Sequence, residues 1–174
     1  MSLLLKAAAD AGLQVNWYTY YAGGTGGPTA VKQTGLNHRV FAIQEGSANI
    51  GGDATHKIEE AFRAKHKAGV FYPRMFNQMR MLKTAINNAK STDSAKIGAA
   101  LEDMKVEVFN GGEGQMRKDD HQFFQPMYIV SFGERDPAKE KMDEEGTGWG
   151  WRTVAKIESK DTNVPTTCKM KRPG

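Results

Sequence analysis

The chain of 174 residues has a single cysteine, no long apolar run and none of the short motifs that mark common catalytic sites. One cysteine, Cys168, excludes an internal disulfide and a zinc site built from several thiolates. No segment approaches the roughly 18 consecutive apolar residues of a membrane-spanning helix, and no segment at the start resembles a signal peptide. HExxH, GxSxG and P-loop patterns are also missing, so the sequence predicts no catalytic residue.

The titratable residues likewise lack the spacing of a metal or acid–base site. His56 and His66 fall on one expected helix but are separated by roughly 15 Å along its axis, so they cannot share a metal. Asp119, Asp120 and His121 are adjacent, but neighbouring residues on a strand point to opposite faces. We therefore expect no metal, no cofactor and no enzymatic activity.

The charge is modestly basic, with a formal net charge of +4 and a pI near 9.1. Part of the excess lies in one cluster, Lys169–Arg172, and the other Lys and Arg residues alternate with Asp and Glu as on a solvated face. No helix-turn-helix, RRM or zinc-finger pattern accompanies it. We therefore expect no nucleic-acid partner.

The most informative segment is an aromatic run, Trp17–Tyr21, that ends in the glycine-rich loop Gly23–Gly27. A strand that stops in bare backbone is typical of ligand sites at the carboxyl ends of strands in α/β sheets. The loop lacks the Lys-Ser or Lys-Thr pair of a P-loop, and the next helix begins only near Pro28. A phosphate site is thus an alternative to a site for a smaller solute.

Hydrophobic periodicity predicts helices and strands in alternation, followed by consecutive strands. The expected helices cover Leu4–Ala9, Pro28–Gln33, a segment from Asp53, a segment from Pro73, and Ser94–Met104. The expected strands are Gln14–Tyr20, Arg39–Gln44, Val106–Val108, Gln115–Arg117, Phe123–Phe132 and Trp149–Ile157. The alternation predicts a layered α/β domain with a mostly parallel sheet. The strand-rich tail predicts that the chain leaves one lobe for another.

Three of the expected helices carry apolar residues on one face. The apolar residues are Ala54, Ile58, Ala61 and Phe62 in the first, which share their face with Lys65; Met75, Met79, Leu82 and Ile86 in the second; and Ile97, Leu101 and Met104 in the third. The second is the most regular, and we expect it to face the core.

Several segments, taken in order, resemble the periplasmic substrate-binding proteins of branched-chain amino acid and amide ABC transporters, typified by the leucine/isoleucine/valine-binding protein. The segments are Leu4–Ala8, Asn16–Gly23, Arg117 with Asp120–Gln122, Gln125–Tyr128, and Pro165–Met170. The resemblance covers nearly the whole chain but only about the C-terminal half of a family member. Leu3–Ala9 already has mid-helix character, so we expect a fragment, and the resemblance implies that the signal peptide and most of the first lobe are absent.

The resemblance implies a three-layer α/β lobe of the type I periplasmic binding protein (flytrap) fold, with a strand-rich C-terminal segment that crosses the hinge. By the family pattern, residues 3–104 form the second-lobe portion and residues 105–133 the hinge-crossing strands. Residues 134–174 then form strands and a tail that return toward the first lobe. Ligand would be held between two lobes that close about a three-strand hinge.

The resemblance also implies ligand contacts from the loop after the first strand. The expected ligand-binding residues are Tyr20, Tyr21, Ala22, Gly23, Glu45 and Tyr72. Amino-acid binders commonly carry a carboxylate in this loop for the ligand ammonium, and Tyr21 stands at that position here. The expected ligand is therefore a branched-chain or other amino acid, an amide, or an aromatic or carboxylate compound. An amino acid would place its ammonium group over the Tyr21 ring in a cation–π contact.

The implied function is the solute-binding component of an ABC importer, acting in the periplasm with an inner-membrane permease as its partner. The alternatives are a nucleotide-binding or other α/β enzyme domain that uses Gly23–Gly27, and a ligand-sensing domain of the same fold. Unpaired strand edges and apolar surface further predict a homo-oligomer of the fragment.

Overall fold

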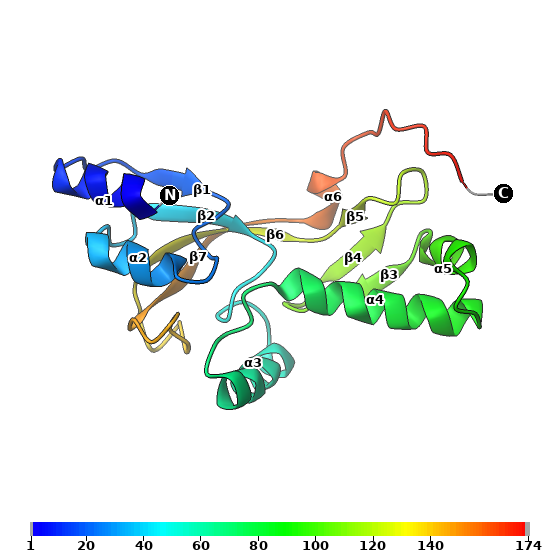
Figure 1. The fold of residues 1–174 in the computed structure, drawn as a ribbon, viewed down its shortest axis with the longest axis horizontal. Coiled ribbons are helices and arrows are strands. Elements are labelled where there is room, and N and C mark those ends of the chain that lie inside the picture. Colours follow the sequence, from blue (N-terminus) through cyan, green and yellow to red (C-terminus); the bar gives the residue numbers. More distant parts are fainter. Residues whose placement is uncertain (1, 173–174) are drawn as a thin grey trace. The chain divides into compact units, whose positions relative to one another are not determined.

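The computed structural model describes residues 2–172 and divides them into two compact units (Figure 1). Unit 1 contains the residues up to Phe71 together with Met127–Lys156, and unit 2 contains Tyr72–Pro126 together with the residues from Ile157 onward. The chain therefore passes from one unit to the other three times. These limits differ from the predicted segments 3–104, 105–133 and 134–174, whose assignment to lobes stays a prediction.

Unit 1 is built on a four-stranded sheet in the order β1-β2-β6-β7. Its elements are α1 (Ser2–Asp10), β1 (Trp17–Thr19), α2 (Gly27–Thr34), β2 (Val40–Gln44), α3 (Asp53–His66), β6 (Met127–Glu134) and β7 (Trp149–Ile157). The helices and strands alternate as predicted through α3, which confirms the α/β class. Strand β7 has the predicted bounds.

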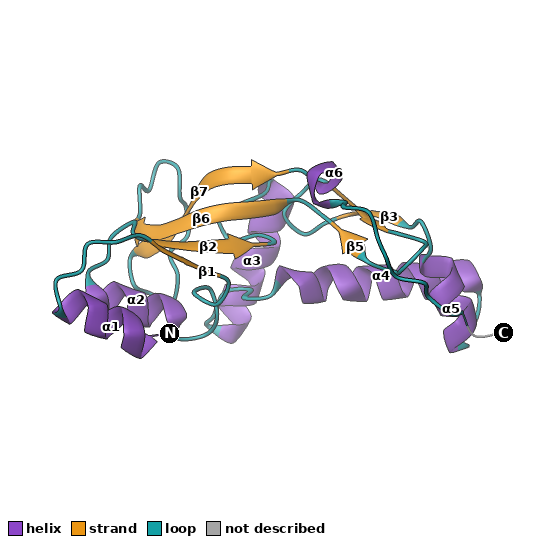
Figure 2. Ribbon diagram, turned by 90° about the horizontal axis from the view of Figure 1, so that it is seen from above, coloured by secondary structure: helices purple, strands orange, loops and turns teal. Residues whose placement is uncertain are grey.

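The prediction of a mostly parallel sheet is wrong. β1 and β2 are parallel, but β2 and β6 are antiparallel, and Figure 2 shows β6 and β7 running in opposite directions. The register pairs Gln44, the last residue of β2, with Tyr128 near the start of β6. The chain thus re-enters unit 1 at the edge where β2 ends, and β6 runs back along β2 from there.

The core of unit 1 lies on one face of the sheet. Val40 and Ala42 on β2 are opposite Phe132 and Val130 on β6, and all four are buried. Leu5 of α1 and Val31 of α2 belong to the same cluster, so these two helices cover that face. The Phe132 ring lies 5.7 Å from that of Trp149 and 4.8 Å from that of Trp151, which joins β7 to the core.

Unit 2 contains a second, antiparallel sheet in the order β3-β4-β5. Its elements are α4 (Pro73–Ala89), α5 (Ser94–Leu101), β3 (Lys105–Glu107), β4 (Glu113–Met116), β5 (Phe123–Phe124) and the short α6 (Ser159–Thr162). Asp93 caps α5 by accepting a hydrogen bond from the Lys96 amide at 3.0 Å. The predicted apolar face of α5 is confirmed, because Ile97, Leu101 and Met104 belong to one cluster.

Pro126 divides the single strand predicted for Phe123–Phe132. Proline cannot donate a hydrogen bond to a neighbouring strand, so the ladder stops there. The residues before it form β5, which pairs with β4, and those after it form β6, which pairs with β2. One apolar run therefore serves both sheets.

The prediction that the regular apolar stripe of α4 faces the core is wrong. Met75, Met79 and Leu82 are 56%, 64% and 41% exposed, while the buried stripe contains Asn77, Met81 and Ala85. Asn77 is buried because its side chain accepts a hydrogen bond from the Phe109 amide at 2.7 Å and donates one to Gln125 at 3.0 Å. Hydrophobic periodicity assigns a polar residue such as Asn77 to the exposed face, because it does not take into account the hydrogen bonds that allow the side chain to be buried.

The predicted apolar face of α3 is also wrong. Its buried residues are Thr55 and Glu59, whereas Ala54, Ala61 and Phe62 are exposed. Glu59 is turned inward by buried hydrogen bonds that the sequence pattern does not reveal. Among residues 2–172, no helix has the length and apolarity needed to cross a membrane.

Because Phe132 is fully buried between both tryptophans, we expect Phe132→Ala to lower the free energy of unfolding by about 3–5 kcal/mol. Urea denaturation followed by tryptophan fluorescence measures the change. The matched control is Ile43→Ala on the neighbouring strand, where the side chain is 45% exposed and the loss should stay below about 1 kcal/mol. Equal losses in both variants would contradict this placement of the core.

Candidate functional site

The candidate site lies where the parallel strands β1 and β2 end together. Thr19 is paired with Ala42, so the residues that follow both strands meet at one edge of the sheet. This edge holds Tyr20, Tyr21, Ala22 and Gly23 after β1, and Glu45 after β2. The Tyr20 hydroxyl donates a hydrogen bond to the Glu45 carboxylate at 3.0 Å. The structure thus brings together predicted residues that are 25 positions apart in the chain.

The two tyrosines present different surfaces. Tyr21 is 77% exposed, and its ring meets that of Tyr20 edge-on with centroids 5.7 Å apart. The Tyr21 amide donates to the Thr19 hydroxyl at 3.1 Å, which tightens the turn after β1. Tyr21 therefore offers an open ring face, whereas Tyr20 offers a hydroxyl already aligned with a carboxylate.

The remaining predicted residues have structural surroundings of different kinds. Ala22 is fully buried in the core of unit 1, so its side chain anchors the loop. A Cβ at Gly23 would lie 2.5 Å from the side-chain nitrogen Nε2 of Gln44. Gln44 therefore lies beside the loop, although the sequence did not suggest it. Tyr72 belongs to unit 2, where the Arg74 guanidinium lies 5.6 Å from its ring centroid.

The glycine loop leads into the N-terminus of α2, and a carboxylate of the chain itself occupies that position. Glu145 accepts hydrogen bonds from the Gly26 amide at 2.5 Å, the Thr29 amide at 3.0 Å and the Thr29 hydroxyl at 2.5 Å. A helix N-terminus attracts anions through its free N–H groups and its dipole. Because Glu145 already uses these donors, the geometry disfavours a nucleotide phosphate in this loop.

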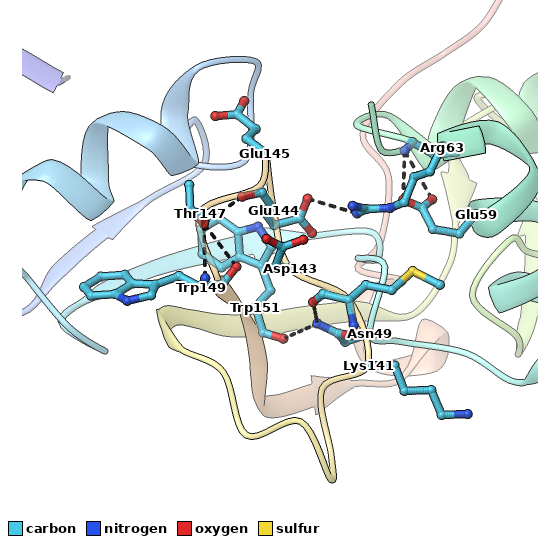
Figure 3. Close-up of polar contacts among 12 residues, drawn as sticks. Asn49, Glu59, Arg63, Lys141, Asp143, Glu144, Glu145, Thr147, Trp149 and Trp151 are labelled. Carbon is cyan, nitrogen blue, oxygen red and sulfur yellow. Dashed lines mark hydrogen bonds and ion pairs between the residues drawn. The ribbon is translucent and has the colours of Figure 1, made fainter. Parts of the chain in front are cut away.

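A second carboxylate of the same turn points the other way (Figure 3). The Glu144 carboxylate lies 3.5 Å from the Arg63 guanidinium of α3. Arg63 also donates to Glu59 at 2.8 Å, and Glu59 accepts from the Val70 amide at 3.1 and 3.2 Å. Burial raises the pKa of the Glu144 carboxyl to about 7, although the nearby Arg63 charge acts in the opposite direction.

Sequence reasoning missed both glutamates. Glu144 and Glu145 lie in a charged loop, and runs of charge usually form a solvated surface. Glu145 is separated from its partners by 116 and 119 positions. No local spacing indicates such contacts, which only the folded sheet creates.

The Asp119–His121 segment does not form an acid–base pair. Asp120 accepts two hydrogen bonds from Arg117, at 2.9 and 2.5 Å. This guanidinium holds the pKa of Asp120 well below its usual range. His121 instead lies 3.4 Å from Glu102, so the two neighbours have separate partners. Asp119 and Asp120 lie in a turn between β4 and β5, so the predicted alternation of strand faces is not the reason.

The sequence matches the periplasmic binding protein family over residues 1–137, and the chain belongs to this family. A Leu/Ile/Val-binding protein homologue of Brucella abortus is 29% identical over 99% of this chain and 42% of the relative. A homologue of the same name from Brucella suis matches to the same extent. The chain thus spans less than half the length of the curated relatives that it matches.

Solved structures show the same fold. A leucine-, isoleucine-, valine-, threonine- and alanine-binding protein of Brucella ovis, in a closed conformation, superposes with a TM-score of 0.83 at 22% identity, covering 98% of this chain and 44% of that one. A solute-binding protein of an ABC transporter from Rhodopseudomonas palustris BisB5, in complex with 3,4-dihydroxybenzoic acid, gives 0.64 at 14% identity, covering 91% and 48%. These neighbours confirm the type I periplasmic binding fold predicted from the sequence.

The buried Glu144 carboxyl makes stability depend on pH in a defined direction. Its pKa is raised from 4.5 to about 7 on folding, so its contribution is complete below 4.5 and is lost as the pH rises through about 7. We expect Glu144→Gln to reduce the fall in unfolding free energy between mildly acidic and mildly basic pH by on the order of 2 kcal/mol.

Urea denaturation at a series of pH values measures this effect. Glu60→Gln is the matched control, since Glu60 is an exposed glutamate on the neighbouring helix α3. The control should keep the pH profile of the parent chain. A Glu144→Gln profile as steep as that of the parent would contradict the assignment of this pH dependence to Glu144.

Proposed function

We propose that this chain is part of the solute-binding component of an ABC importer, which captures a small organic solute between two lobes. The component acts in the periplasm, delivers its solute to an inner-membrane permease and catalyses no reaction. Family membership and the names of the relatives support this role. The division into two units joined by three chain crossings is in keeping with a hinged receptor.

The observation that carries the proposal is the Tyr20–Glu45 pair beside the open Tyr21 ring. A carboxylate held in place by a hydroxyl is suited to bind an ammonium group, and an aromatic face adds a cation–π contact. Tyr21 replaces the carboxylate that the family pattern places after β1, and Glu45 supplies one from the neighbouring strand at the same edge. The proposed solute is therefore an amino acid.

The same carboxylate separates this ligand class from aromatic acids. The Rhodopseudomonas palustris protein was solved with 3,4-dihydroxybenzoic acid, which has a carboxylate like an amino acid but no ammonium group to offset the repulsion by Glu45. Amides without an ammonium group would lose the charge-assisted contact. Glu45 thus ranks amino acids above both alternatives.

Binding of L-leucine to the complete gene product tests this role. We expect Glu45→Gln to weaken the affinity by roughly 10- to 100-fold, because a hydrogen bond to a charged group contributes about 1.5–3 kcal/mol. Tyr20→Phe should weaken it less, since it leaves the carboxylate in place. Isothermal titration calorimetry measures both variants, with Glu60→Gln as the control.

A thermal-shift screen complements the calorimetry by comparing L-leucine, 3,4-dihydroxybenzoate and ATP. Stabilisation by leucine alone is the expected result. Stabilisation by ATP without any effect of amino acids would favour the nucleotide-binding alternative. Tighter binding of the aromatic acid than of leucine would contradict the role of Glu45.

We also propose that the 174-residue chain self-associates through the exposed apolar stripe of α4, formed by Met75, Met79 and Leu82. Contiguous exposed apolar surface commonly marks an interaction site. Met79→Glu should lower the apparent mass in multi-angle light scattering, whereas Asn87→Glu, an exposed position on the same helix, should not. A monomer at every concentration of the parent chain would overturn this proposal.

A further inference from the structure

Glu145 connects the loop before β7 with the start of α2. Both of its carboxylate oxygens are used, one by the Gly26 amide and the other by the amide and hydroxyl of Thr29. The Glu145 backbone is left-handed, with a φ of 55°, a conformation that a non-glycine residue rarely adopts. Such a conformation persists where the surrounding contacts determine it.

The turn that carries Glu145 is fixed from its other side (Figure 3). Asn49 donates to the Met142 carbonyl at 2.8 Å and accepts from the Met142 amide at 2.9 Å. Asp143 accepts from the Gly148 amide at 2.9 Å, and the Thr147 hydroxyl donates to the Glu144 carbonyl at 2.7 Å. The Glu144 side chain is directed to Arg63, away from Glu145. These hydrogen bonds hold the turn in place, and none of them involves α2.

The start of α2 is in turn packed against the candidate site. The Gly27 amide donates to the Gly24 carbonyl at 2.8 Å. A Cβ at Gly27 would lie only 2.4 Å from the Ala22 carbonyl oxygen, so the two backbones are in close contact. Ala22 directly follows Tyr21 and is fully buried. A shift of Gly26 and Gly27 would therefore move the loop that presents both tyrosines.

We propose that Glu145 is a positioning residue for the solute-binding loop Tyr20–Gly23. It acts by neutralising the N-terminus of α2, and through Gly27 and Ala22 it holds the loop in the conformation that places Tyr20 beside Glu45. The link to solute rests on the proposed function, whereas the link to loop order does not. Without Glu145, the amides of Gly26 and Thr29 lose their acceptor and the first turn of α2 opens more often.

Hydrogen exchange on the 174-residue chain tests the effect on the loop. In Glu145→Ala, the amides of residues 20–29 should exchange roughly tenfold faster, while those of β2 and β6 keep their rates. Glu145→Gln, which retains one acceptor oxygen, should give a smaller increase. The control Glu60→Ala removes an exposed carboxylate of the same unit and should change neither region.

Chemical rescue separates positioning from a general loss of stability. Sodium formate supplies a small carboxylate that can take the place of the missing side chain at the vacated donors. Formate should slow exchange of residues 20–29 in Glu145→Ala but not in the parent chain, relative to sodium chloride at equal ionic strength. Unchanged exchange in Glu145→Ala, or equal effects of formate and chloride on it, would overturn the proposal.

The effect of Glu145 on solute binding is measured with L-leucine and the complete gene product. We expect Glu145→Ala to bind leucine more weakly than the parent protein and formate to restore part of the affinity. Equal affinities of parent and variant would overturn the role toward solute. If the parent protein itself fails to bind leucine, the proposed amino-acid function is contradicted, while the exchange and rescue results still decide whether Glu145 positions the loop.

Discussion

The antiparallel pairing of β2 with β6 is the interaction on which unit 1 depends. It places Val40 opposite Phe132 and Ala42 opposite Val130, and these buried side chains are the centre of the core. The pairing joins residues from two stretches of chain that are separated by all the helices and strands of Tyr72–Pro126. Both the helices on the core face and the tryptophans of β7 pack against this centre.

The same pairing determines where the candidate site lies. Because β6 runs antiparallel to β2, the chain enters unit 1 at the edge where β1 and β2 end. That edge holds Tyr20 and Glu45, the hydrogen-bonded pair proposed to recognise an ammonium group. In the proposed function, Glu45 after β2 supplies the carboxylate that the loop after β1 does not carry, since the two parallel strands end side by side.

Charged side chains perform two different tasks around this edge. Glu59, Arg63 and Glu144 form a buried cluster that connects α3 with the turn before β7. Glu145, the next residue, binds the first turn of α2. The position at the N-terminus of α2 that a phosphate would occupy is therefore filled by the Glu145 carboxylate. The glycine-rich loop thus resembles a nucleotide site in sequence, but Glu145 already uses its donors.

The sequence by itself determined the α/β class, the family, the alternation through α3 and the strand that ends in the glycine loop, because periodicity and turn residues are local properties. The resemblance to the family also suggested Tyr20 and Glu45 as ligand contacts; the structure joins them by a hydrogen bond, and their role in binding stays a prediction. The tertiary structure decided strand direction, which stripe of α3 and α4 is buried, and the partners of Glu144 and Glu145. These depend on contacts between distant segments, and a buried Asn77 or Glu59 is recognised only when the groups that satisfy its hydrogen bonds are in place.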